Sequence, residues 1–438
     1  MAQMYCGDEV PAVVLDIGSF NCRVGNAGEA APKHIFRSVV GEYDNTSYFG
    51  DIGVRVLRPM EVKPAIETPF SFYSDVNNSV DLASPTINDS TINWDYLDGL
   101  LHYGINCAIN GGTSVSRKKS DPSLVDGTSS GGRSSADYSL FFTESHFNNL
   151  QKKQRLAEIC FEKYSTPGFY ISSNAALAAL SMCKPTALVI DIGASGTTVS
   201  PVVDGFALYR STKRTPLGGD YFNRCIVGYL QQQSVYSGVK PWFDINNSGA
   251  GVNFTQSFRK YHCSNIVQDL KNWITVVPYT RLGHLSKGDR SQLLMDSLHI
   301  PPFVLPDGTN VVQSDMLVST AECLFQEPTH NYSVPSAEPA NTTPWCIPPL
   351  VQLVRDAIFH SGVDGDVRKE LLGNILIVGG GSLIDGVAHR LVHELTHHLN
   401  SSPGSSSSGA SSMSAGGAPA TGKAGGKTKG GDLVFKVR

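Results

Sequence analysis

Short apolar runs that end in glycine-containing turns recur along the chain and predict its strands. Residues 12–15, 187–190 and 375–378 are uninterrupted apolar stretches, and a glycine follows each within three positions. Runs of this length, bounded by turn residues, are typical of buried strands. Between residues 156 and 164 the apolar positions instead follow the three- and four-residue spacing of a helix. Strands that alternate with helices predict an α/β fold.

Four segments with few large apolar side chains interrupt this pattern. They cover residues 74–93, 110–137, 326–349 and 401–431, and we expect the first three to be insertions. The fourth is almost entirely Ser, Gly, Ala and Lys. Because such a composition buries too little apolar surface to offset the entropy lost on ordering, a disordered linker is expected. Residues 432–438 then return to a strand-like pattern.

The composition of the whole chain argues against several classes of protein. With 438 residues and a net charge of −4, the chain is long enough for two or more domains and has no overall attraction to nucleic acid. No apolar run reaches the ~20 residues that a membrane-spanning helix needs. The nine cysteines form no Cys-x-x-Cys pair, which argues against a zinc site or a disulfide framework. We expect an intracellular protein that contacts neither a membrane nor a specific nucleic-acid sequence.

The first glycine-rich turn carries the residue types of a phosphate-binding loop. Asp16 follows the apolar run, Gly18, Ser19 and Phe20 come next, and Arg23 lies shortly after. Glycine lets the backbone approach an anion closely, and successive N–H groups form a nest for its oxygens. The aspartate can hold the hydration shell of Mg²⁺, and the arginine can bind phosphate through two hydrogen bonds.

A second turn, 175 residues further along, repeats this arrangement. Asp191 again follows an apolar run, and Gly193, Ala194, Ser195 and Gly196 come after it. One Asp-x-Gly turn is weak evidence, because such turns are common. Two copies, each after a predicted buried strand, suggest two related halves that close on one nucleotide. We therefore predict that Asp191 and its counterpart in the first turn form the metal-binding pair.

Three consecutive glycines after the last predicted strand form a third turn. The backbone of Gly379, Gly380 and Gly381 is bare and can pack against a flat adenine ring. Ser382 and Leu383 follow directly and belong to the same predicted base-binding segment. Such a run is by itself a common strand-to-helix turn, and its place after the other two turns makes it informative.

Together the three turns resemble those of the superfamily of actins, sugar kinases and seventy-kilodalton chaperones. Four further segments are similar to actins in particular and occur in the same order: residues 158–167, 304–308, 321–326 and 366–374. The resemblance implies an actin-like ATPase fold, in which two related α/β domains enclose a nucleotide cleft. It also implies ATP and Mg²⁺ as ligands.

The same resemblance divides the chain into domains. Residues 1–183 would form the small actin-like domain and residues 184–400 the large one, each around a mixed sheet. Residues 432–438 would return as a strand of the small domain. Gly219 and Lys271 match positions that contact the nucleotide in actins, the lysine at the ribose, so both belong to the predicted site.

Within the actin family, the chain resembles the nuclear actin-related proteins of chromatin-remodelling and histone-acetylating assemblies more than it resembles conventional actin. Residues 92–96, 143–145 and 215–220 carry this resemblance together with the phosphate turns. It implies a nuclear, non-filamentous subunit that a long helix of a large scaffold or motor subunit holds. Conventional actin, and histones or the nucleosome, are further partners that it suggests.

Three positions depart from the residues with which actins hydrolyse ATP. Ala194 stands where actin has an aspartate, Thr198 where it has a histidine near the attacking water, and Glu158 where it has a glutamine that positions this water. Threonine cannot act as a general base near neutral pH. Because phosphoryl transfer depends on positioning and electrostatics, we expect binding with little hydrolysis, and hence a scaffold and not an enzyme.

Two other interpretations of an actin-like fold are a cytoskeletal ATPase that polymerises and a small-molecule kinase. Residues 42–66 lack the pattern of the loop that joins subunits in actin filaments, which argues against polymerisation. The kinase interpretation lacks an identifiable acid for a sugar substrate. We therefore keep the polymerising ATPase as the main alternative.

One motif suggests a different chemistry. His393, Glu394 and His397 match the HExxH pattern of zinc proteases. Such a site needs a third protein ligand, yet no glutamate follows Glu394 and the chain passes into the Ser/Gly-rich segment. We expect an ordinary helix here, with its histidines along a solvated stripe.

Overall fold

The computed structural model describes residues 11–50, 52, 59–68, 70–71, 91–111, 115–118, 121–126, 134–144, 150–232, 239–245, 253–279, 301–311, 320–326, 348–360 and 362–400. The predicted insertions 74–93 and 326–349 lie largely outside these ranges, and residues 401–431 and 432–438 lie entirely outside them. None of the helices in the described ranges combines the length and the apolar character that crossing a bilayer requires.

The first domain is built on a sheet with the strand order β12-β11-β1-β2-β3. Its strands are β1 (Ala12–Ile17), β2 (Asn21–Asn26), β3 (His34–Arg37), β11 (Ser139–Glu144) and β12 (Phe169–Ser173). Strand β1 is parallel to β11 and antiparallel to β2, so the first glycine-rich turn is the tight connection from β1 to β2. Alternate side chains of the sheet, such as Val13, Leu15 and Leu140, are buried in one core with helix α1 (Trp94–Asn110).

The second domain repeats this plan. Its sheet has the order β15-β14-β13-β19, and β16 also pairs with β14. The strands are β13 (Ala187–Ile192), β14 (Thr197–Val203), β15 (Phe206–Ala207), β16 (Lys213–Thr215) and β19 (Ile375–Val378). Strand β13 is antiparallel to β14 and parallel to β19, just as β1 is to β2 and β11. The three apolar runs of the sequence are thus β1, β13 and β19, which confirms the prediction of strands and of an α/β fold.

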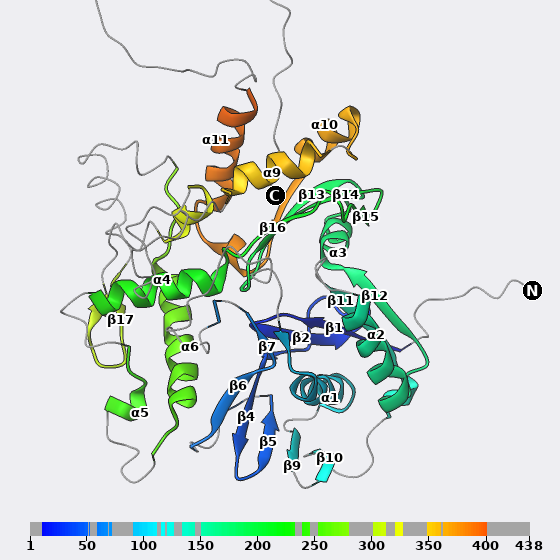
Figure 1. Cartoon of the computed structure of the whole chain (residues 1–438), viewed down its shortest axis with the longest axis vertical. Coiled ribbons are helices and arrows are strands. Elements are labelled where there is room, and N and C mark those ends of the chain that lie inside the picture. Colours follow the sequence, from blue (N-terminus) through cyan, green and yellow to red (C-terminus); the bar gives the residue numbers. More distant parts are fainter. Residues whose placement is uncertain are drawn as a thin grey trace, which may run out of the picture.

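Helices cover the second sheet and bury its apolar side chains. They are α9 (Leu350–Ile358), α10 (Gly365–Gly373), α11 (Val387–Asn400) and the 3₁₀ turns η6 (Ala321–Leu324) and η8 (Gly380–Leu383). Helix α3 (Asn174–Ser181) lies between the two sheets (Figure 1). Its Ala175 and Ala179 share a buried cluster with Val189 of β13, so this helix packs on the second sheet although we assigned its residues to the small domain.

A third sheet extends the first domain, with the order β10-β9-β5-β4-β6. Its strands are β4 (Val39–Tyr43), β5 (Thr46–Phe49), β6 (Glu61–Pro64), β9 (Val115–Lys118) and β10 (Asp121–Asp126). The predicted insertion 110–137 therefore supplies a hairpin, β9 and β10, that lengthens this sheet, and the 3₁₀ turn η3 (Ser135–Asp137). A short pair, β7 (Ile66–Glu67) and β8 (Thr91–Ile92), lies nearer the first sheet.

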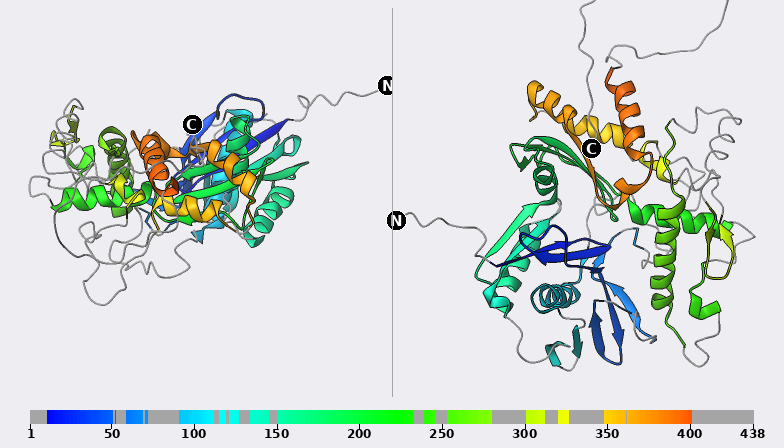
Figure 2. Two further views of the ribbon diagram at one scale, coloured as in Figure 1. Left: turned by 90° about the horizontal axis from the view of Figure 1, so that it is seen from above. Right: turned by 180° about the vertical axis from the view of Figure 1, so that it is seen from behind.

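Opposite the third sheet stand helices that belong to the second domain (Figure 2). They are α4 (Gly219–Gln232), α5 (Trp242–Ile245) and α6 (Gln256–Ile274), with the hairpin of β17 (Phe303–Val304) and β18 (Asn310–Val311) beside α6. Helix α6 begins at Thr255, whose hydroxyl accepts a hydrogen bond from the Phe258 N–H, and such a cap satisfies a backbone donor at the helix start.

The helix predicted between residues 156 and 164 is present. Helix α2 (Leu150–Glu158) continues into one turn of π-helix, η4 (Ile159–Lys163). Leu156, Ile159, Cys160 and Tyr164 all pack into the first-domain core, as their spacing predicted.

Candidate functional site

A cleft of about 700 Å³ lies between the two domains. The glycine-rich turns after β1, β13 and β19 converge on it, although they are far apart in the sequence. The predicted nucleotide-binding residues that line the cleft are Asp16, Gly18, Ser19, Phe20, Arg23, Asp191, Gly193, Ala194, Ser195, Gly196, Gly219, Lys271, Gly379, Gly380, Gly381 and Leu383. The arrangement can surround one ligand from both domains.

The first turn is held by backbone and side-chain hydrogen bonds. The Gly18 N–H donates to the Asn21 carbonyl at 3.1 Å, and the Ser38 hydroxyl donates to the Gly18 carbonyl at 2.6 Å. Asp16 accepts hydrogen bonds from Arg23 at 2.9 Å and from the Thr143 hydroxyl at 2.6 Å. A Cβ at Gly18 would lie 2.8 Å from the Asn21 carbonyl oxygen, so only glycine fits this turn without a shift.

The second turn is held mainly by backbone. The Gly193 N–H donates to the Gly196 carbonyl at 3.0 Å, and the Gly219 N–H donates to the Gly193 carbonyl at 2.9 Å. The Asp220 N–H donates to the Ala194 carbonyl at 2.9 Å, so the start of α4 is bonded directly to the turn. A Cβ at Gly218 would lie 2.6 Å from the Gly193 carbonyl oxygen, because two stretches of backbone are in contact there.

The strand-end aspartates of the two turns bring their charges together. Burial raises the pKa of Asp191 above its ordinary value, and the negative charge of Asp16 adds to this effect. Mg²⁺ is commonly bound through one or two carboxylates together with phosphate oxygens, and this pair fits that requirement. Among the residues that the structure describes, no group of three or more His, Cys, Asp or Glu could hold a metal by itself. A metal here would therefore share its coordination with a ligand and water.

The third turn lies directly on the end of β13. Gly379 has a φ of 86°, and a Cβ there would be 2.5 Å from a carboxylate oxygen of Asp191. A Cβ at Gly381 would collide with Ile192. Gly379 and Gly381 are therefore required by the close approach of this turn to the end of β13, whereas a Cβ at Gly380 would meet nothing within 4 Å. Ser382 differs from the prediction: it does not line the cleft, because its hydroxyl donates to the Gly379 carbonyl at 2.7 Å and stabilises the turn instead.

A buried lysine and aspartate form the edge of the cleft beside α4. The Lys271 ammonium group donates to the Gly219 carbonyl at 3.2 Å. Burial lowers the pKa of Lys271 to about 8, and the nearby Asp220 carboxylate partly opposes that shift. Burial raises the pKa of Asp220 to about 6, although a hydrogen bond from Thr68 stabilises its charged form. A charged ligand in the cleft would therefore shift the protonation of both groups.

The three departures from the actin pattern have different structural outcomes. Ala194 and Thr198 line the cleft. The carboxylate and the imidazole that actins carry at these two positions are therefore absent from the cleft itself. Glu158 does not line the cleft. Its side chain lies on an exposed face at the end of α2, where its carboxylate forms an ion pair with Arg155 at 2.9 Å. The carboxylate that stands at the position of actin's glutamine therefore lies outside the cleft.

The cleft also contains side chains that we did not predict: Glu144, Arg214, Asp220 and Gln268. Asp220 directly follows the predicted Gly219, and an acidic residue at a helix start was a signal that could have found it. No signal in the sequence pointed to Arg214, because its position at the cleft depends on the pairing of β16 with β14.

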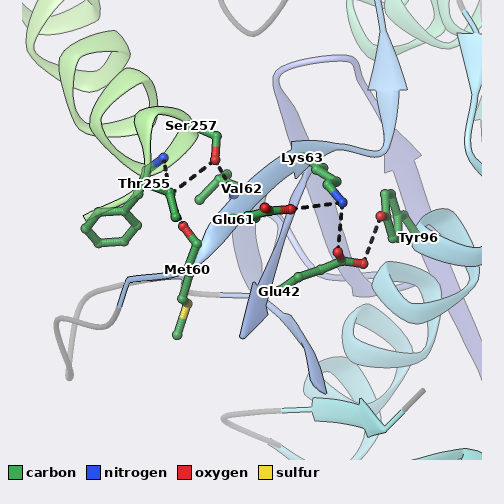
Figure 3. A network of polar contacts seen from close by, with 9 residues as sticks. Glu42, Met60, Glu61, Val62, Lys63, Tyr96, Thr255 and Ser257 are labelled. Atoms are coloured by element: carbon green, nitrogen blue, oxygen red, sulfur yellow. Dashed lines mark hydrogen bonds and ion pairs between the residues drawn. The ribbon is translucent and has the colours of Figure 1, made fainter. Parts of the chain in front are cut away.

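Contacts between the third sheet and α6 bridge the domains. The Val62 N–H donates to the Ser257 hydroxyl at 3.0 Å, and the Thr255 hydroxyl donates to the Met60 carbonyl (Figure 3). Apolar side chains from both domains form one buried cluster: Val39, Ile52, Met60, Val62, Phe243, Phe254, Phe258 and Tyr261. Arg37 of β3 adds a hydrogen bond of 2.6 Å to Asn265 of α6.

The HExxH segment lies on α11 and is structural. The Glu394 carboxylate is buried and accepts a hydrogen bond from the buried Arg390 at 2.9 Å, so it is not available to activate water. His393 and His397 face each other with ring centroids 4.5 Å apart. As noted above for the described residues, no third ligand joins them. These contacts agree with our prediction of an ordinary helix.

Comparison with known proteins gives a family for this fold and site. The Actin family profile matches residues 7–415. The chain is 26% identical over 418 residues to actin-related protein 4 of Oryza sativa subsp. indica, which covers 89% of this chain and 86% of the relative. Proteins of the same name from Emericella nidulans (27% over 427 residues, 90% of this chain and 85% of the relative) and Neurospora crassa (28% over 426 residues, 89% and 84%) are also similar. These relatives are all named actin-related protein 4. The chain belongs to the actin family.

Proposed function

We propose that the protein is a non-filamentous actin-related subunit of a nuclear chromatin-remodelling or histone-acetyltransferase complex. It binds ATP and Mg²⁺ as structural ligands and helps the complex to assemble and to dock on nucleosomes. The observation that carries this proposal is a cleft whose phosphate turns are intact while two hydrolytic side chains are replaced by Ala194 and Thr198. Neither residue can hold a metal by a carboxylate or accept a proton near neutral pH.

The protein would hold the nucleotide largely through backbone. The turns at Gly18 and Gly193 offer N–H groups to phosphate oxygens, and Arg23 and Lys271 add positive charge. Mg²⁺, when bound at the strand-end aspartates, neutralises part of the phosphate charge. No side chain in the described part of the cleft replaces the missing imidazole as a base at the position of Thr198, so binding is favoured over turnover.

The bridge between the domains supports a retained ligand. Opening the cleft at the third sheet means separating the cluster around Met60 and Phe258, which is buried in the closed form. Phe70 of the first domain also inserts into the core of the second, where its ring lies 5.2 Å from that of Tyr221. Separating buried apolar surface costs ~25 cal/mol per Å², so a closed cleft is the favoured state.

An apolar patch beside the second sheet supports a partner that binds there. Leu180 and Met182, at the end of α3, and Phe206 of β15 are 53%, 43% and 76% exposed. A Cβ at Gly205 would lie 4.0 Å from Leu180, so the helix end and β15 are adjacent. We call these three residues the α3–β15 patch. A long amphipathic helix of a scaffold or motor subunit would bury such side chains at i, i+3 and i+4 spacing.

The nucleotide part of the proposal is tested by measuring the nucleotide bound to purified protein and the phosphate released over hours. We expect stoichiometric ATP and a release rate below that of conventional actin under matched conditions. The double variant Ala194→Asp with Thr198→His should, if anything, raise the rate, and Thr198→Ser serves as the matched control that restores no base. Turnover by the wild-type protein at or above that of actin would contradict the proposal.

The assembly part is tested with tagged protein in nuclear extract of the source cells. We expect a stoichiometric subunit with a long helix to co-purify, with conventional actin or histones as further components. Leu180→Glu with Phe206→Glu should remove that subunit. Val304→Glu, a control at a residue that is 59% exposed on β17, should retain it. A cytoplasmic protein that purifies alone, or that forms ordered filaments with Mg²⁺ and salt, would exclude the chromatin role.

A further inference from the structure

Arg214 enters the cleft from a strand that carries no glycine-rich turn. It belongs to β16, where it is the direct cross-strand partner of Thr198 on β14. Directly opposed residues of an antiparallel pair project from the same face of the sheet. Arg214 therefore stands beside Thr198, at the position where actins carry the histidine near the attacking water, and both residues line the cleft.

The contacts of Arg214 orient its guanidinium toward the second phosphate turn. Its Nη2 donates to the Ser195 hydroxyl at 3.1 Å. The positive charges of Arg214 and Arg23 both lower the pKa of Asp191, whereas burial raises it by a larger amount. Arg23, which follows the first turn, is bonded to the Asp16 carboxylate at 2.9 Å. Ala194, next to Ser195, has no carboxylate that would compete for the guanidinium.

We propose that Arg214 binds the terminal phosphate of the nucleotide and makes the cleft selective for a nucleoside triphosphate over a diphosphate. The inference deepens the proposed function and rests on it, since it concerns the same cleft. A guanidinium offers a planar fork of N–H donors that matches two phosphate oxygens. The terminal phosphate would lie where the second turn and β16 meet, whereas the first turn and Arg23 serve the inner phosphates.

The variant Arg214→Met tests this assignment, with Lys213→Met as its control. Lys213 is the neighbouring residue on β16, opposite Val199, so it faces the other side of the strand and does not line the cleft. Affinities for the β,γ-imido analogue of ATP and for ADP are measured by competition against a fluorescent etheno-ATP. Thermal unfolding of each variant without nucleotide shows whether it is folded.

We expect Arg214→Met to weaken binding of the triphosphate analogue about ten- to hundred-fold, as loss of a charge-assisted hydrogen-bonded pair does, and ADP by less than about threefold. Arg214→Lys keeps the charge without the fork and should fall in between. Lys213→Met should leave both affinities unchanged. Equal weakening of both nucleotides by Arg214→Met, or no weakening, would overturn the proposal.

The outcome also separates this inference from the proposed function. If the wild-type protein binds both nucleotides and Arg214→Met changes neither affinity, the assignment of Arg214 is wrong while the structural-nucleotide function stands. If the wild-type protein binds neither nucleotide, both are wrong. If Arg214→Met slows phosphate release without changing affinity, Arg214 acts on turnover, and the triphosphate-selectivity proposal is again overturned.

Discussion

The first glycine-rich turn, after β1, and the second, after β13, differ in how the rest of the molecule holds them. The first is tied by the side chains of Ser38 and Thr143 and by one backbone bond, from the Ser38 N–H to the Phe20 carbonyl at 3.0 Å. Its Asp16–Arg23 ion pair is 37% and 44% exposed. The second is tied by backbone to residues 217–220 at the start of α4, where the Thr197 hydroxyl also donates to the Leu217 carbonyl at 2.7 Å. Two similar motifs are therefore held differently. The first turn depends more on side chains and carries an exposed ion pair, whereas the second is bonded by backbone to the start of α4, so we expect the second to be the more rigid turn.

This difference follows from the neighbours of each turn. The first turn is flanked by β11, which reaches it through the side chain of Thr143, and by Ser38, which lies between β3 and β4. The second is flanked by α4 and by β16, whose backbone passes so close that glycine is needed at 218. Substitutions in the two turns should consequently differ in kind as well as in size.

The largest effect is expected from adding a methyl group to the rigid turn. Gly218→Ala would place its Cβ 2.6 Å from both the Gly193 carbonyl oxygen and the Gly196 nitrogen, and neither backbone can move away. We expect a loss of about 3 kcal/mol in the free energy of unfolding, from denaturant titration. Gly18→Ala, which meets only the Asn21 carbonyl at 2.8 Å, should cost about 1–2 kcal/mol. Equal losses would mean that the two turns are equally rigid.

A pH-dependent effect is expected next, at Asp220. Because its pKa is raised to about 6 in the folded state from an ordinary value of 3.8, the folded protein binds more protons than the unfolded chain between these values. This group's contribution to stability is therefore lost as pH rises from about 4 to about 6. Asp220→Asn has no carboxyl group to titrate, so it does not lose this stability. The free energy of unfolding of the variant relative to that of the wild type should therefore increase by up to about 3 kcal/mol as pH rises from about 4 to about 6. Denaturant titrations at several pH values measure the difference, and a constant difference would contradict the assignment.

A smaller effect of the same sign is expected at Asp191. Its folded-state pKa is raised, chiefly by burial, so its ionised form destabilises the ligand-free protein above the ordinary aspartate pKa. Asp191→Asn should stabilise the ligand-free protein at pH 7, by less than Asp220→Asn does, and should weaken Mg²⁺-dependent nucleotide binding. The gain should shrink as the pH falls. Stabilisation without loss of binding would remove Asp191 from the metal site.

The smallest effect on stability is expected at the exposed ion pair of the first turn. Asp16→Asn should change the free energy of unfolding by less than about 1 kcal/mol, because a partly exposed pair with Arg23 contributes little and is screened by salt. Nucleotide binding should nevertheless fall as it does in Asp191→Asn. Thermal unfolding at low and high salt, alongside nucleotide titration, checks both points. A loss of stability as large as that of Gly218→Ala would reverse the comparison.

Much of the site could be predicted from the sequence, because each phosphate turn is formed by residues that are close together in the sequence. A turn of glycine and small residues after a strand needs only neighbouring positions, so Gly18, Gly193 and the glycines of the third turn were found at once. Ser382 was predicted from its place in a motif, but its hydroxyl donates to the Gly379 carbonyl within the turn. Glu158, at the position of actin's glutamine, lies on the exposed face of α2. Packing between segments distant in sequence also put α3 on the second sheet and made residues 110–137 part of the third.

The sequence by itself determined the three buried strands, the helix between residues 156 and 164 and the duplicated turns, since the spacing of apolar side chains and of glycines is a property of short segments. Only the tertiary structure decided that Arg214 stands beside Thr198, that α4 frames the second turn and that a cluster around Met60 and Phe258 bridges the domains. The physical reason is that strand register and inter-domain packing depend on contacts between residues that are distant in sequence. Many pairings satisfy the local pattern of each segment, and only their simultaneous packing selects one.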